Sequence, residues 1–257
     1  MQATVHALIH RGLQRPGNED ALAVGDWVAG NDLERPKRLD LPLDPPAVVL
    51  VADGMGGHAA GDVASRTAIQ AAASGAPQVR DAAAAMRVLE DANRAVYAAM
   101  ERGEGAPGMG TTLAGLVLWR DGTGALAAVW FGVGDSKIYR IDPGSAPLQR
   151  SVDDTPGAKL DDGRTAAATT PILSQSLGGQ AGYSEIVPHA EAEAPAAGSR
   201  YLLCTDGLSD LVGREEIGAI LEDCGDDAAA VQRLFDAAMQ RGGKDNVAIA
   251  LLRCPDN

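Results

Sequence analysis

The hydrophobic positions in the first part of the chain form short runs separated by polar, turn-rich segments. Residues 4–10 (TVHALIH) and 20–24 (DALAV) predict short strands on either side of a loop rich in turn residues. Residues 25–46 are polar and rich in proline, and they predict an irregular connection. Residues 47–52 (AVVLVA) are apolar throughout and lie between Pro-Pro and Asp-Gly. This pattern is typical of a strand that is buried on both faces.

Helical periodicity follows this strand. Residues 60–73 and 79–101 predict two helices, and Gly103 follows the second as a stop signal. After residue 108 the pattern changes to strands joined by turn-rich segments. TTLAGLVLW and ALAAVWFGV flank RDGTG, and KIYRI and PLQRS flank DPGSA. These two patterns predict two β-hairpins.

The last part of the chain mixes strands and helices after a long segment without firm periodicity. Residues 151–182 are rich in Asp, Thr, Gly and Ala. A segment of this length without secondary structure is usually functional. The elements predicted after it are strands at 183–188, 200–204 and 246–253 and helices at 214–223 and 227–241.

This order of elements does not alternate regularly between strand and helix. Strands are followed by helices, then by many strands, and finally by helices and a closing strand. The order favours an α+β layered fold over a doubly wound parallel sheet. No change in composition marks a linker, so we expect residues 1–257 to form a single domain with a variable segment at about 151–182.

Charge and composition narrow the classes of protein. The chain has 257 residues, with 22 Lys and Arg against 35 Asp and Glu, and a net charge of −13. This balance argues against nucleic-acid binding and against attachment to a membrane surface, which both need a basic region. The three cysteines match neither a disulfide framework nor a zinc site. Without a signal-peptide pattern or a long apolar run, we expect a cytoplasmic protein.

Acidic residues repeatedly stand at the ends of the apolar runs, and three of the aspartates adjoin a glycine. A carboxylate at the end of a buried strand is costly unless it is paired or binds a metal. A single Asp-Gly pair is most simply a turn, but several converging carboxylates need a cation. Ligands that are all oxygen suit Mg²⁺ or Mn²⁺. The acidic residues in question are Glu19, Asp20, Asp53, Asp135, Asp206 and Asp245.

Six motifs around these residues carry a family resemblance. The chain resembles the metal-dependent protein phosphatases of the 2C type, in their bacterial form, and the motifs follow the order of that family. They are RPGNED (15–20), VADGMGGHAAG (51–61), GMGTT (108–112), VGDSKIYR (133–140), LLCTDGLSD (202–210) and KDNVAIALL (244–252).

The resemblance implies a four-layer α-β-β-α sandwich, in which two stacked antiparallel sheets are flanked by helices and the metals bind at one end. It also implies hydrolysis of phosphoserine and phosphothreonine monoesters on proteins by a metal-activated water. The implied cofactors are two Mn²⁺ or Mg²⁺ ions, and a third ion remains open. Two such ions about 3.5–4 Å apart can acidify a bridging water and hold it in line with phosphorus.

The resemblance gives each matching residue a role. Arg15 and Asp53 are the catalytic candidates, because Arg15 would bind the phosphate and Asp53 would bridge the two ions. The carbonyl of Gly54 and the carboxylate of Glu19 would serve one ion, and Asp206 and Asp245 would serve the other. The remaining roles are support of the metal ligands by Asp20, a third ion at Asp135 with Asp206, and a hydrogen bond near the phosphate or a turn cap from Asn246.

Several alternatives remain open at this stage. An alternative role for Asp135 is to hold a turn. His58 is a less favoured candidate for the general acid. The segment TTPILSQSLGG keeps Leu177-Gly178 but lacks the His-Pro step and the arginine of many bacterial members, so substrate recognition is not carried over. The implied partners are a phosphoprotein and a bacterial Ser/Thr kinase whose action is reversed. The alternative function is a partner-switching phosphatase or scaffold that acts on one dedicated binding protein.

Overall fold

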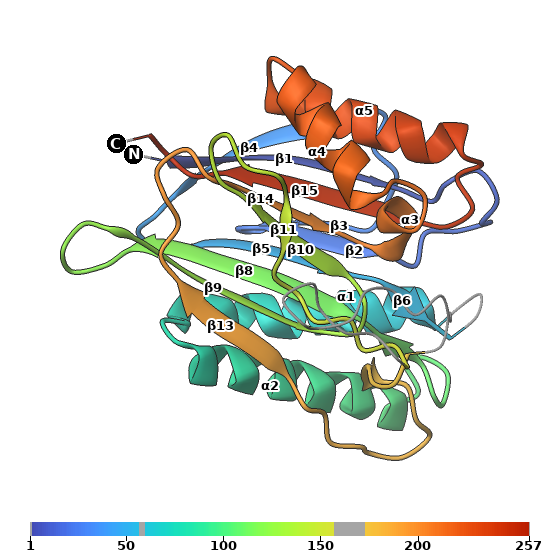
Figure 1. Cartoon of the computed structure of the whole chain (residues 1–257). Coiled ribbons are helices and arrows are strands. Elements are labelled where there is room, and N and C mark those ends of the chain that lie inside the picture. Colours follow the sequence, from blue (N-terminus) through green and yellow to red (C-terminus); the bar gives the residue numbers. More distant parts are fainter. Residues whose placement is uncertain (1, 57–59, 157–172, 257) are drawn as a thin grey trace.

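The computed structural model describes residues 2–56, 60–156 and 173–256, and within them two six-stranded antiparallel sheets are stacked face to face (Figure 1). Helices cover the outer face of each sheet. The predicted α-β-β-α sandwich is therefore confirmed. One sheet has the order β11 (Leu148–Gln149), β10 (Lys137–Ile141), β14 (Arg200–Cys204), β15 (Val247–Arg253), β1 (Gln2–His10), β4 (Lys37–Pro42). The other has the order β13 (His189–Glu193), β9 (Leu126–Val133), β8 (Leu113–Arg120), β5 (Ala47–Ala52), β2 (Ala21–Val24), β3 (Trp27–Ala29).

The helices form two groups, one on each side of the stacked sheets. A smaller sheet, in the order β12 (Leu177–Gly178), β7 (Gly110–Thr111), β6 (Gly54–Met55), lies at one end of the sandwich. Among the described residues, no helix is both long and apolar enough to cross a membrane. One group is α1 (Gly61–Gly75), a 3₁₀ turn (Ala76–Gln78) and α2 (Ala82–Glu101), and the other is α3 (Asp206–Ser209), α4 (Arg214–Asp223) and α5 (Asp227–Gln240).

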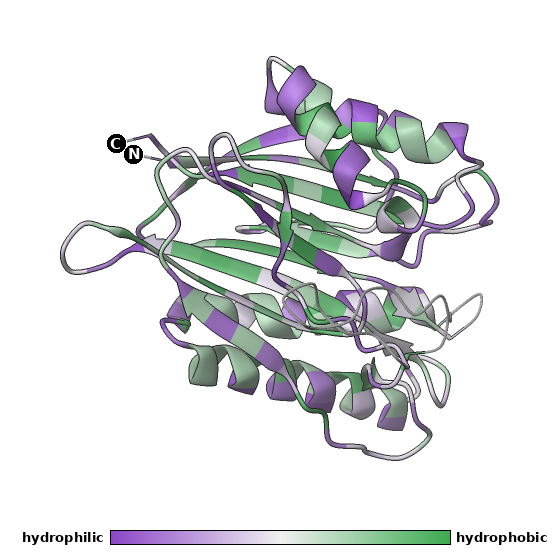
Figure 2. Ribbon diagram, in the orientation of Figure 1, coloured by the Kyte–Doolittle hydropathy of each residue, from purple (hydrophilic) through white to green (hydrophobic). Residues whose placement is uncertain are grey.

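The central strands are buried on both faces, which explains their uninterrupted apolar sequences. In β15, Ile249 and Leu251 pack under α4 and α5, while Ala250 and Leu252 point into the layer between the sheets. This division follows from the two-residue repeat of a strand. Figure 2 shows the result, with hydrophobic strands in the interior and polar residues on the outer turns of the helices.

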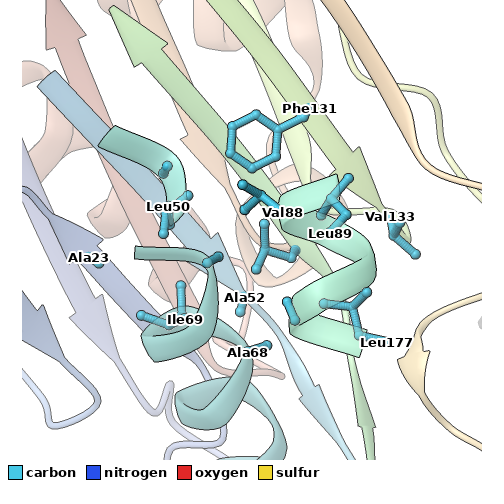
Figure 3. Packing of buried hydrophobic residues seen from close by; sticks show 14 of the residues in the cluster. Ala23, Leu50, Ala52, Ala68, Ile69, Val88, Leu89, Phe131, Val133 and Leu177 are labelled. Carbon is cyan, nitrogen blue, oxygen red and sulfur yellow. The ribbon is translucent and has the colours of Figure 1, made fainter. Parts of the chain in front are cut away.

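Small side chains bring α1 and α2 close to the sheet that contains β8 and β9. The buried face of α1 presents Ala64, Ala68 and Ala72, and Phe131 of β9 is fully buried in this layer (Figure 3). A Cβ on Gly115 of β8 would collide with the Phe131 ring. The glycine thus makes room for the Phe131 ring.

Two predictions of secondary structure were wrong. The predicted irregular connection at 25–46 contains β3 and β4. Charged residues interrupt the apolar pattern of β4. It is an edge strand whose Leu39 and Leu41 pack against the layer between the sheets. The strand predicted at 183–188 is absent, and β13 begins directly after it. Pro188 has no N–H to pair, and the backbone of Val187 bonds instead to the Gln175 side chain.

The layer between the sheets should dominate the stability of the fold. Leu203 of β14 is fully buried there, so we expect Leu203→Ala to lower the free energy of unfolding by about 2–5 kcal/mol. Leu148 of β11 is 51% exposed, and Leu148→Ala is the matched control with an expected change within about 0.5 kcal/mol. Urea unfolding followed by circular dichroism measures both, and equal losses would contradict this account of the core.

Candidate metal and phosphate site

The acidic residues named from the sequence gather at one end of the sandwich. The loop between β1 and β2, the end of β5, the start of α3 and the loop that enters β15 all lie at the end opposite the two termini (Figure 1). The ends of antiparallel strands from both sheets thus carry these side chains to one edge. Their electrostatic interactions, described below, show that they share one site.

Asp53 and Asp206 are the centre of this cluster. Their carboxyl groups interact directly, and each changes the pKa of the other. Desolvation by burial, followed by the charge of Asp206, raises the pKa of Asp53 well above its ordinary range. Burial and then the charge of Asp135 raise the pKa of Asp206 to about 6. Without a cation, the site therefore holds protons that isolated carboxylates would release.

Two threonines fix the backbone that carries Asp53. The N–H of Asp53 donates to Thr112 Oγ1 at 2.9 Å, and its carbonyl accepts from Thr111 Oγ1 at 2.8 Å. The carbonyl also accepts from the N–H of Thr112 at 2.9 Å. The hydroxyls of Thr112 and Ser136 lie 2.6 Å apart, which links this turn to the residue after Asp135. Both threonines belong to GMGTT, one of the motifs that carry the family resemblance.

Asp20 lies beneath the cluster and is almost completely buried. The hydroxyl of Thr205 donates to Asp20 Oδ2 at 2.8 Å and accepts from the N–H of Ala248 at 2.9 Å. Burial raises the pKa of Asp20 well above its ordinary range, with a contribution from the charge of Asp206. Its other oxygen, Oδ1, has no hydrogen-bond partner, and the same holds for Oδ1 of Asp206. Two buried carboxyl oxygens are therefore left without a donor.

Glu19 and Gly54 meet where there is no room for an additional side chain. A Cβ on Gly54 would collide with the carbonyls of Gly61 and Glu19, and a Cβ on Gly61 would collide with the Glu19 carboxylate. The Glu19 carbonyl also accepts from Ser65 Oγ at 2.6 Å. The glycines of the predicted metal motif therefore let the end of β5 contact the start of α1 and the Glu19 backbone.

Arg15 reaches the cluster from the exposed side. Its Nη2 lies 2.6 Å from Asp245 Oδ2, and 55% of its side-chain surface is exposed. The hydrogen bond to Asp245 raises the pKa of Arg15. The guanidinium thus stands beside a candidate metal ligand while part of its planar fork remains open to a ligand from solvent.

Asp135 belongs to the same charged region. Its charge raises the pKa of both Asp53 and Asp206, and burial raises its own pKa against the opposing charge of Lys137. Lys137 Nζ forms an ion pair with Asp153 Oδ2 at 2.7 Å and also donates to the Asp135 carbonyl at 3.3 Å. Asp153 was not a candidate in the sequence analysis, because it lies in a segment without a recognisable pattern.

The donor set fits divalent cations by its chemistry, although the side chains do not enclose one. In the three ranges that the structure describes, no three His, Cys, Asp or Glu side chains are arranged to hold one metal ion. The candidates nevertheless offer only oxygen atoms, and two of these atoms are buried and unpartnered. Mg²⁺ and Mn²⁺ prefer such ligands.

The structure brings together every site residue named from the sequence that it describes. His58 and residues 157–172 of the segment 151–182 lie outside the described residues. The residues that sequence reasoning missed are mainly the hydroxyl-bearing neighbours of the aspartates, Thr112 and Thr205. Thr205 directly precedes Asp206 in CTDG, whereas Thr112 adjoins no aspartate in the sequence and reaches Asp53 only through the fold. Thr111 was noted in the sequence and lies against Asp53 as a structural contact.

A comparison with protein families agrees with this geometry. The family model described as protein phosphatase 2C matches residues 43–252. The chain belongs to the protein phosphatase 2C family. The match covers the candidate ligands from Asp53 onward and leaves Arg15 and Glu19 to be judged from the structure.

Bacterial members of the family are similar to this chain. The serine/threonine protein phosphatase PstP of Mycobacterium tuberculosis is 33% identical over 251 residues, which cover 94% of this chain but 43% of that protein. The chain thus spans less than half the length of this curated relative. The crystal structure of M. tuberculosis PstP/Ppp superposes with a TM-score of 0.75 and 29% identity, covering 99% of this chain and 100% of that one.

One solved structure contains metals. The catalytic domain of PstP in complex with two manganese ions has a TM-score of 0.74 and 31% identity to this chain, with complete coverage of both chains. Its fold and that of this 2C-family chain are therefore the same along their whole length.

The raised pKa of Asp206 predicts an unusual response to pH in EDTA. A carboxyl whose pKa rises from 3.8 to about 6 on folding contributes stability below pH 4 that is lost as the pH rises through 6. Asp206→Asn cannot ionise, so we expect it to gain stability relative to wild type between pH 4 and 7. Thermal unfolding in EDTA at several pH values measures this difference.

The control for this titration is Asp236→Asn. Asp236 is an exposed residue of α5 whose carboxylate accepts from Gln232. This variant should follow the wild-type pH dependence. An Asp206→Asn curve parallel to wild type would show that Asp206 does not titrate with a raised pKa.

Proposed function

We propose that this chain hydrolyses phosphoserine and phosphothreonine monoesters on proteins at a binuclear Mn²⁺ or Mg²⁺ centre. The observation that carries the proposal is the group of carboxylates that interact around Asp53 and Asp206, with the guanidinium of Arg15 beside Asp245. Membership of the 2C family and the manganese-containing PstP structure support it. Arg15, Asp53 and the cations would then share one reaction site.

The proposed ligand set follows the positions of the side chains. Asp53 interacts with Asp206 and directly precedes Gly54, whose Cα lies against the Glu19 carbonyl, so we assign Asp53 as the ligand shared by two ions. We assign the Gly54 carbonyl and Glu19 to one ion, and Asp206 and Asp245 to the other. Asp20 supports the ligands from below, since its charge acts on Asp53 and its carboxyl is fixed by a threonine. Asp135, whose charge acts on Asp206, is the proposed additional ligand of a third ion.

In this mechanism, the bound ions supply the Lewis acidity that activates water and neutralises phosphoryl oxygens. Arg15 binds the phosphate through its planar fork and orients the phosphorus toward the carboxylate cluster. The threonine contacts to Asp53 and Asp20 hold these carboxyl groups in place before substrate arrives. Phosphoryl transfer requires little covalent chemistry of the protein, so positioning and charge neutralisation are the main contributions of these residues.

The substrate would be a phosphoprotein, and the reaction would reverse a bacterial Ser/Thr kinase in the cytoplasm. The substrate, the kinase and the location are part of the proposal and go further than membership of the 2C family. Asp53, Asp206 and Asp245 are all present and interact with one another. The chain therefore retains candidate metal ligands that an inactive scaffold would not need. We therefore favour an enzyme over the partner-switching scaffold.

The proposal predicts turnover that depends on divalent cations. With para-nitrophenyl phosphate we expect activity in Mn²⁺ that EDTA abolishes. Asp53→Asn and Asp206→Asn should each reduce kcat to the background rate, because each removes an anionic ligand at the centre of the cluster. Asp236→Asn should retain wild-type kcat. Activity retained in both site variants would contradict the proposal.

Arg15 should act on substrate more than on metal. We expect Arg15→Ala to lower kcat/KM for a phosphothreonine peptide by about 10²-fold, the scale seen when a donor to a developing charge is removed. Its Mn²⁺ affinity, measured by calorimetry, should stay close to wild type. Arg11→Ala is the control, since Arg11 lies on the same loop but pairs with Asp32. A large loss of Mn²⁺ affinity in Arg15→Ala would show that its role is misassigned.

A further inference from the structure

Asn246 is a buried polar residue directly after Asp245, at the start of β15. Its Nδ2 donates to the carbonyl of Arg11 at 3.0 Å and to that of Gly17 at 2.9 Å. Its Oδ1 accepts from the N–H of Glu19 at 2.7 Å. One side chain therefore contacts the loop between β1 and β2 at three points.

These contacts decide between the two roles that the sequence left open. A side-chain amide has two hydrogens on its nitrogen, and both are used by the carbonyls of Arg11 and Gly17. Asn246 is only 5% exposed. It therefore has no free donor for a phosphate, and its role must be exerted through the loop that it binds.

The loop that Asn246 binds is the one that carries Arg15. The carbonyls of Arg11 and Gly17 stand on either side of Arg15 in the sequence, so the amide closes the loop around this residue. The N–H of Leu13 donates to the Gly243 carbonyl at 2.8 Å, which fixes the same loop from a second side.

We propose that Asn246 is a positioning residue whose amide holds the loop of residues 11–19 in the shape that directs Arg15 to the phosphate. This inference rests on the proposed phosphatase function and adds a residue that determines substrate binding without touching substrate. Because the Asn246 backbone follows directly from Asp245, the same residue places Arg15 and a proposed metal ligand at a fixed separation. The ion pair of 2.6 Å between Arg15 and Asp245 is the visible consequence.

The test is a double-mutant cycle of Asn246→Asp and Arg15→Ala at saturating Mn²⁺. Aspartate keeps the size and the acceptor for the Glu19 N–H but removes both donors to the loop. We expect Asn246→Asp to lower kcat/KM for a phosphothreonine peptide roughly tenfold or more. If Asn246 acts through Arg15, the double variant should lose no more than about threefold beyond Arg15→Ala. Fully multiplied losses, or an unchanged kcat/KM in Asn246→Asp, would overturn the proposal.

Asn93→Asp is the matched control for loss of a buried amide. Asn93 on α2 is fully buried, donates to the Ser184 carbonyl at 2.9 Å and accepts from the Gly178 N–H at 2.9 Å. Neither of these hydrogen bonds involves the loop of residues 11–19. Whatever loss Asn93→Asp causes should therefore multiply with that of Arg15→Ala. A control that is as non-additive as Asn246→Asp would overturn the proposal.

Amide hydrogen exchange gives a readout that does not depend on activity. In Asn246→Asp, exchange should become faster in residues 11–19 while the amides of β8 and β9 keep wild-type protection. If this variant does not fold, Asn246→Ser is measured in the same way, with the same expectation. Unchanged exchange in the loop would overturn the proposal. Absence of Mn²⁺-dependent turnover in wild type would instead contradict the phosphatase function, and the exchange result would still test the loop contact.

Discussion

Mutual repulsion among buried carboxylates is the constraint on which the site depends. Asp53 and Asp206 interact directly, and Asp20 and Asp135 add their charges to the same region. Such a group can exist in a folded protein only if protons or cations neutralise it. The raised pKa values of Asp20, Asp53 and Asp206 show that protons neutralise these carboxyl groups when no cation is bound. Divalent cations would neutralise the same charges and would also serve hydrolysis of a phosphate ester.

The sandwich has the stiffness that this arrangement requires. Asp53 directly follows β5, and Asp206 follows β14 after Thr205. Asp245 lies two residues before the start of β15, and the apolar residues of these three strands are buried. The threonines Thr112 and Thr205 bind the Asp53 backbone and the Asp20 carboxyl. By contrast, Arg15 lies on an exposed loop that is fixed by side-chain and backbone contacts to residues 243–246. The acidic centre is thus built at the ends of strands, while the arginine proposed to bind phosphate depends on a loop.

The sequence predicted the parts of the fold whose signal is local. Apolar runs such as 47–52 identified the strands buried on both faces, and the aspartates at their ends identified the candidate site. The sequence did not predict β4 or β13, because edge strands with charged residues carry a weak apolar pattern. It also left the role of Asn246 open. The partner carbonyl of Arg11 is 235 positions away, and only the completed sheet brings the two together.

The central claim is that the carboxylates at this edge bind two divalent cations. Crystals grown with Mn²⁺ and measured at the manganese absorption edge test it most directly. We expect two anomalous peaks in contact with Asp53, with Asp206 and Asp245 at one of them and Glu19 and the Gly54 carbonyl near the other. A map without peaks at these carboxylates, at a Mn²⁺ concentration that supports turnover, would contradict it.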